Sequence, residues 1–85
     1  MIRRQNHVAW SQFIYELEDA KEHLENLLNE IQADDEYGDE KFRIDLGHVY
    51  AHLNRAWNSR NIEKEISKKE WENNSKFPQD IQPVG

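Results

Sequence analysis

The sequence predicts an all-α protein built on an antiparallel two-helix hairpin with an extended C-terminal tail. Two long stretches carry apolar residues at alternating three- and four-residue steps, the spacing that gathers them on one side of an α-helix. A short acidic segment around Gly38 separates the stretches, and neither glycine nor proline occurs before it. These observations favour two long helices joined by a tight turn, with coiled-coil-like packing between them.

The first helix is expected over residues 6–33. Its polar positions are rich in Glu and Asp, and Leu, Glu and Ala are residues that favour a helix or tolerate it well. The apolar seam runs without interruption through Trp10, Phe13, Leu17, Ala20, Leu24, Leu27 and Ile31.

The acidic segment 34–39 is expected to be the turn. Acidic residues are unfavourable at a helix C-terminus and favourable at an N-terminus. The acids Asp34–Glu36 therefore indicate that the first helix ends there, and Asp39 and Glu40 suit the start of the second. Gly38 permits a turn conformation, and Asp39 is expected to cap the amides that follow. Because the connection is short, the two helices should lie antiparallel.

The second helix is expected over residues 40–72, giving a hairpin domain over 1–72 and a tail over 73–85. Four polar residues at 58–61 interrupt its apolar pattern. We favour a continuous or kinked helix here; the alternative is a break, with Asn61 capping a short third helix to about Glu72. The apolar seam of the second helix contains Phe42, Leu46, Val49, Leu53 and Ala56.

The tail contains both prolines of the chain and is therefore expected to be extended. It also carries Phe77, Ile81 and Val84. We expect these side chains to dock on the hairpin or on a second copy.

The apolar arc is wider than one helical hairpin needs. Chains of 85 residues bury a limited share of their surface, and without cysteine no disulfide adds stability. We therefore expect a homodimer in which two hairpins form a four-helix bundle. The residues that widen the arc are Trp10, Phe13, Ile14, Leu28, Tyr50 and Trp57.

Charge is distributed unevenly between the two halves of the hairpin. Residues 16–40 contain eleven acids and one base, whereas residues 41–69 contain seven bases and three acids. Opposite charges favour pairing of the two helices, each exposed pair by roughly 0.2–1 kcal/mol. Two solvated faces that differ by chance are the alternative interpretation.

Histidines on one flank define a candidate metal site. His48 and His52 are four residues apart, so their side chains leave the helix in the same direction. If the turn pairs residues whose numbers sum to about 75, His23 faces His52 and Glu30 faces Asp45. The resulting ligand set suits zinc or another divalent ion and contains His23, His48, His52, Asp45 and Glu30. The simpler interpretation is that His23 and His52 are boundary residues bonded to nearby carboxylates, with no cofactor.

Residues 54–61 mix amide, guanidinium and indole groups, a composition enriched in protein interfaces. Arg55, Trp57, Arg60 and Tyr50 are therefore candidate partner-binding residues. Burial of Trp57 in the core or in the dimer is the competing interpretation. Nucleic-acid binding is not expected, since the net charge is −6 and the acids of the first helix repel phosphate.

No residue pattern indicates catalysis. The serines lie in no nucleophile elbow, and no glycine-rich loop is present to hold a phosphate. No apolar run approaches the roughly 20 residues of a membrane span. We expect a cytoplasmic, non-enzymatic protein–protein interaction module, with a metal-binding bundle and an antitoxin-like or regulatory partner protein as alternatives.

Overall fold

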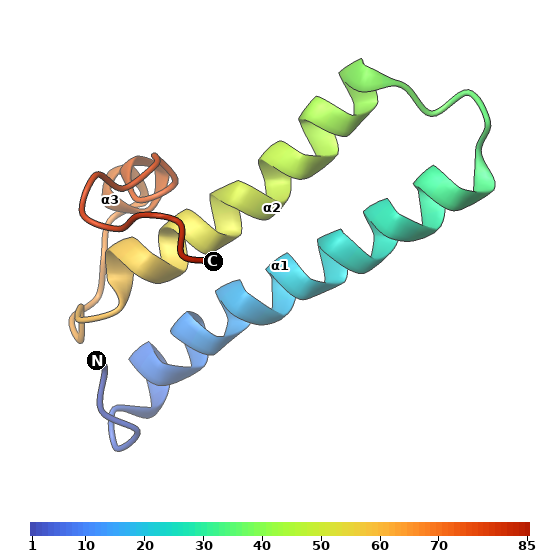
Figure 1. The fold of residues 1–85 in the computed structure, drawn as a ribbon. Helices are drawn as coiled ribbons and strands as arrows, with labels where there is room; N and C mark the ends of the chain where they lie inside the picture. The colour runs from blue at the N-terminus through green and yellow to red at the C-terminus, as the bar shows by residue number, and fades with distance from the viewer.

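A computed structural model describes residues 1–85 and contains three helices and no strand. The two long helices, α1 (His7–Ala33) and α2 (Asp39–Ser59), pack side by side and run antiparallel (Figure 1). A short helix, α3 (Lys68–Asn73), follows a loop, and an extended tail ends the chain. The predicted all-α hairpin is thus confirmed.

The ends of α1 and the turn lie close to their predicted positions. The side chain of Asn6 accepts a hydrogen bond from the Ala9 amide, which caps the start of α1. At the other end, the Asp34 amide donates to the carbonyl of Glu30. The predicted cap of α2 is off by one residue: Gly38 is the N-cap, without a side-chain bond, and Asp39 begins the helix.

The predicted continuous helix over 40–72 is wrong beyond Ser59. At the end of α2, the carbonyl of Arg60 accepts a hydrogen bond of 2.8 Å from the amide of Ile2, so a tertiary contact replaces the next helical bond. The alternative, a break before a short third helix, is the one found. Its cap is Ser67, not Asn61, in a reciprocal capping box with Glu70.

The N-terminal segment fastens the loop that follows α2. Ile2 is buried, and Arg3 donates to the carboxylate of Glu63 at 3.2 Å. The side-chain amide of Asn6 donates to the carbonyl of Glu63 at 2.8 Å. These bonds close the open end of the hairpin and set where α3 lies.

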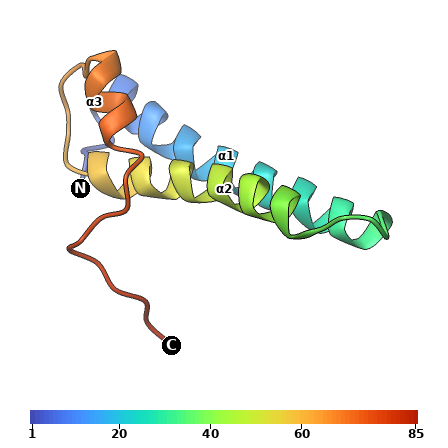
Figure 2. The same ribbon diagram turned by 90° about the horizontal axis from the view of Figure 1, so that it is seen from above.

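The tail docks on α2, as expected, through its first residues. Asn54 donates to the carbonyl of Ser75 at 2.9 Å, and Asn58 donates to the carbonyls of Asn74 and Lys76. Phe77 meets Tyr50 edge to face at 5.1 Å between ring centroids. Asp80 makes a last contact with Trp57 of α2, and the end of the chain then points away from the hairpin (Figure 2). Val84 is 99% exposed, so its predicted docking is not seen in the monomer.

The register of the hairpin agrees with the prediction that facing residues of the two helices have numbers that sum to about 75. His23 stacks on His52 with ring centroids 5.0 Å apart, and Lys41 bridges Glu30 and Asp45. The face that α1 turns to α2, however, is rotated from the predicted seam. It contains Ala9, Phe13, Glu16, Ala20, His23, Leu27 and Glu30, opposite Asp45, Val49, His52 and Ala56.

This rotation makes the inter-helix seam small and partly polar. Ala9, Ala20 and Leu27 are buried, while the predicted seam residues Leu17 and Leu24 are not. No helix is long and apolar enough to cross a membrane.

Candidate functional site

The hairpin offers three candidate sites: a polar network in the seam, an apolar face on one side and a groove on the other. Each depends on which residues α1 turns toward α2. We call the positions that face the other helix the seam. In an antiparallel pair, the residues that come directly after a seam position on either helix lie on one side of the hairpin. The residues that come directly before a seam position lie on the opposite side.

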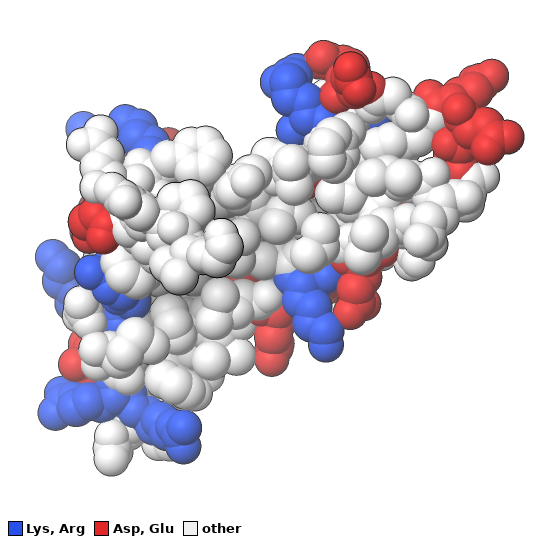
Figure 3. Space-filling model, viewed as in Figure 1, with Lys and Arg blue, Asp and Glu red and all other residues white.

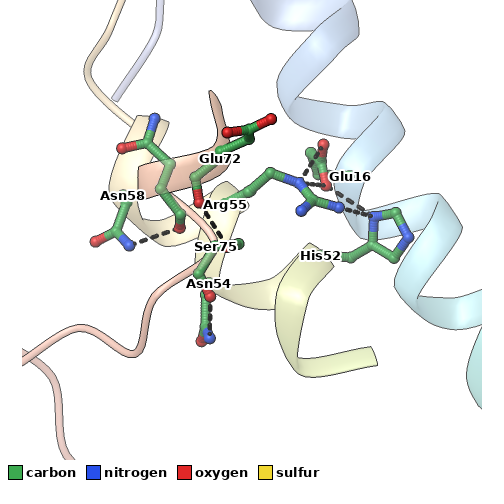
Figure 4. A network of polar contacts seen from close by, with 8 residues as sticks. Glu16, His52, Asn54, Arg55, Asn58, Glu72 and Ser75 are labelled. Carbon is green, nitrogen blue, oxygen red and sulfur yellow. Dashed lines mark hydrogen bonds and ion pairs between the residues drawn. The ribbon is translucent and has the colours of Figure 1, made fainter. Parts of the chain in front are cut away.

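The polar network joins Glu16 of α1 to His52 and Arg55 of α2 (Figure 4). Arg55 Nε donates to both carboxylate oxygens of Glu16 at 3.1 Å, and His52 Nδ1 lies 2.8 Å from Glu16 Oε2. The Arg55 and Glu16 side chains are only 9% and 14% exposed. A charge so far removed from water requires its partner, so this pair fixes the two helices relative to each other.

The network extends to α3 and to the other histidines. The Arg55 guanidinium lies 4.1 Å from the centroid of the Trp71 ring. His48 meets His23 in an edge-to-face arrangement with ring centroids 5.6 Å apart. Because the short Nδ1 contact of His52 faces a carboxylate, we assign the Nδ1 proton to that bond. In this tautomer Nδ1 does not accept from Arg55 Nη2, which lies 3.1 Å from it.

The predicted metal ligands divide into two separate groups. His23, His48 and His52 lie together, whereas Glu30 and Asp45 both bind Lys41 Nζ at 2.9 Å. No three His, Asp or Glu side chains are arranged to hold a metal ion. For His52 the simpler interpretation, a boundary histidine bonded to a carboxylate, is the arrangement found.

The group around Lys41 is an ionic link near the turn. The hydrogen bond from Lys41 lowers the pKa of the Asp45 carboxyl. The Tyr37 hydroxyl donates to Asp45 at 2.8 Å and lowers that pKa further. Partial burial, followed by that bond to Asp45, raises the pKa of Tyr37 to about 12. These charged groups join α1, the turn and α2.

The predicted partner-binding residues contact this chain itself. Arg55 is buried in the network, and Tyr50 packs on Phe77. Trp57 Nε1 donates to Asp80 Oδ1 at 2.8 Å, and the Arg60 guanidinium lies 3.7 Å above the Trp57 ring. The Trp57 bond, with help from Arg60, holds the pKa of Asp80 below its usual value. The unusual composition of residues 54–61 therefore serves to hold the tail.

The apolar face consists of the residues one position after the seam. On α1 only Lys21 interrupts it, and six of its side chains (Leu17, Leu24, Leu28, Ile31, Tyr50 and Leu53) are 40–51% exposed. Figure 3 shows a broad uncharged surface that runs along both helices, with charged residues mainly at its margins. We define the apolar face as Trp10, Ile14, Leu17, Leu24, Leu28 and Ile31 of α1 with Leu46, Tyr50, Leu53 and Trp57 of α2.

The groove lies on the opposite side, between α1, α2 and the segment 62–74. Its volume is about 650 Å³. Glu16, His52 and Arg55 form part of its polar lining, and Trp71 lines it from α3. Figure 2 shows α3 on one side of the hairpin and the tail on the other.

Several residues of these sites are not identifiable from the apolar pattern. Glu16 belongs to the seam, but a seam defined by apolar residues alone places it on the wet face. The Ser67–Glu70 spacing is a recognisable capping-box signal for α3. Nothing local marks Asp80 as the partner of Trp57.

Comparison of the chain with protein-family models, with curated proteins and with solved structures finds no match.

Proposed function

We propose that this protein is a non-enzymatic protein–protein interaction module whose first partner is a second copy of itself. The observation that carries the proposal is the apolar face. Six large side chains on one side of the hairpin are close to half exposed, whereas only six apolar residues of the whole chain are buried. Large contiguous apolar patches on soluble proteins mark interaction sites.

The composition of the seam supports this assignment. Within one hairpin, α1 and α2 are joined by small residues and by the Glu16–Arg55 pair. Apart from Leu27 and Val49, most of the bulky aliphatic residues that usually fill the core of a helical bundle lie on the apolar face. A second hairpin placed face to face covers them and completes a four-helix core.

A second copy is the occupant that fits best. The tail contacts this face at Tyr50 and Trp57. The rest of the face spans both helices, so a two-helix surface of the same kind matches it. Its nearly continuous apolar character also suits a twofold contact, in which each patch meets its own equivalent. An unlike partner would have to supply the same chemistry without that symmetry.

The experiment uses the absence of cysteine from the chain. Leu24→Cys places a single thiol on the apolar face, and Asn26→Cys places one on an exposed position of the same helix away from that face. With a short thiol-reactive crosslinker, we expect covalent dimers from Leu24→Cys and few from Asn26→Cys. Equal yields from both variants would contradict the assignment.

A further inference from the structure

The groove on the side of α3 has the form of a small-molecule site. Its volume of about 650 Å³ lies within the 300–1,000 Å³ range that ligand pockets occupy. Phe13, Ile62, Ile66 and Trp71 supply apolar lining from three parts of the chain. Because the apolar face lies on the other side of the hairpin, the groove stays open whether or not the chain dimerises.

Two donors at the groove have no acceptor within the chain and favour a ligand that supplies one. Arg55 binds Glu16 through Nε, and its Nη1 forms no hydrogen bond within the chain. The Nδ2 atom of Asn74, which also lines the groove, is buried without an acceptor. A buried donor left without an acceptor costs roughly 1–3 kcal/mol, so an acceptor supplied by a ligand is favoured.

The formal charges of the groove favour an anion. Lys64 and Lys68 line it; Lys68 forms an exposed ion pair with Glu72 at 3.9 Å, whereas Lys64 has no acidic partner within the chain. Of the two acids in the lining, Glu16 is neutralised by Arg55, which leaves Asp19 as the one opposing charge.

The geometry points to this groove as a binding site for a small amphipathic carboxylate. The apolar body of the ligand lies against Trp71 and its neighbours, and its carboxylate accepts hydrogen bonds from the groove donors. Trp71 is well placed for this role because one part of it stacks on Arg55 while 44% of its surface remains exposed.

The test compares three probes with the same ring system: 2-naphthoate, the neutral 2-naphthamide and the cationic 2-naphthylmethylamine. Binding to the full chain is followed by calorimetry and by amide chemical-shift changes. We expect naphthoate to bind about threefold or more tightly than the amide, from one desolvated charge interaction, with shifts centred on Trp71 and Ile66. Equal binding of the three probes, or no shift in the groove, would overturn the proposal.

Surface variants separate this site from general attraction to positive charge. Lys64→Gln and Lys68→Gln remove groove charges and should each weaken naphthoate binding by about two- to threefold. Lys69→Gln removes an exposed charge of α3 that does not line the groove, and should leave binding unchanged. Asp19→Asn should strengthen binding. The same loss from all three lysine variants, or weaker binding by Asp19→Asn, would contradict the site.

Discussion

Arg55 of α2 donates from Nε to both oxygens of the Glu16 carboxylate of α1 at 3.1 Å, in a seam from which water is mostly excluded. This pair links the two helices where the other buried residues are small. It also stands at the centre of a network that continues through His52 to His23 and through Trp71 to α3. The seam thus contains charges that depend on each other beside a few buried apolar residues, and most of the large apolar side chains lie outside it.

Glu16→Gln is therefore expected to destabilise the hairpin. The variant leaves Arg55 largely buried without its counter-charge, which costs about 3 kcal/mol in comparable pairs. Chemical denaturation measures the free energy of unfolding. The matched control is Glu22→Gln, an exposed residue of α1 without an ion pair, which should change stability by less than about 0.5 kcal/mol. Equal effects of the two variants would show that the network is not structural.

Replacing both partners should be milder than removing one. In Glu16→Leu with Arg55→Met, no buried charge is left unpaired, and apolar residues often replace such pairs at little cost. We expect the double variant to be more stable than Glu16→Gln in the same denaturation experiment. A double variant as unstable as the sum of its single changes would contradict this interpretation.

The docking of the tail should depend on pH. The hydrogen bond from Trp57 lowers the pKa of the Asp80 carboxyl in the folded chain below its ordinary 3.8. A group whose pKa is lowered on folding stabilises the folded form above its unfolded pKa and loses that effect as the pH falls through the folded value. We therefore expect the Trp57–Asp80 contact to persist at neutral pH and to weaken below about pH 4.

The indole resonances of the three tryptophans measure this release. The Trp57 Nε1–H signal should shift on acidification, while those of Trp10 and Trp71, which make no hydrogen bond to a carboxylate, serve as internal references. Asp80→Asn should remove this transition. A Trp57 transition that persists in Asp80→Asn would show that another group titrates.

Charges introduced on the apolar face should separate the proposed dimer. Leu24→Glu and Leu28→Glu each place a carboxylate where the second copy would bury it, whereas the monomer leaves both positions about half exposed. We expect monomers with nearly unchanged helix content by circular dichroism. Asn26→Glu adds the same charge away from the face and should leave association intact. Loss of helix from the leucine variants alone would indicate an intramolecular role.

Zinc should not stabilise the native protein measurably. His52 directs Nδ1 to Glu16, and in their stacked arrangement the rings of His23 and His52 do not converge on one point. A bound ion would stabilise the folded form by RT ln(1 + L/Kd), where L is the free zinc concentration, so the melting temperature would rise with the logarithm of the zinc concentration. Thermal melts with and without zinc test this expectation. Stabilisation that disappears in His48→Ala would restore the metal-binding alternative.

The pattern of the sequence is sufficient to predict α1, the start of α2, the turn and the register, but not the end of α2. A three-four spacing specifies a helix whatever its apolar residues contact, and a short turn between antiparallel helices sets which residues meet. The predicted pairing of His23 with His52 is confirmed by the stacking of their rings. The early part of the tail also docks as expected, at Phe77.

The orientation of α1 does not follow from that spacing. A broad apolar arc has two flanks, and hydrophobicity alone favours burying its centre. The chain instead turns Glu16 and His23 inward, because each finds a partner in α2 that no local pattern records. The end of α2 differs from its predicted position for a similar reason: the carbonyl of Arg60 binds the amide of Ile2, which is far away in sequence.

Sedimentation equilibrium of the unmodified chain tests the central claim most directly. The chain has a mass of 10.2 kDa. Association through the apolar face predicts a mass that approaches twice this value as the concentration rises through the micromolar range, and Leu24→Glu should return it to that of one chain. A mass of one chain at every concentration up to about 1 mM would contradict the proposed dimer. Such a result would mean that the free energy of association is weaker than about −4.1 kcal/mol.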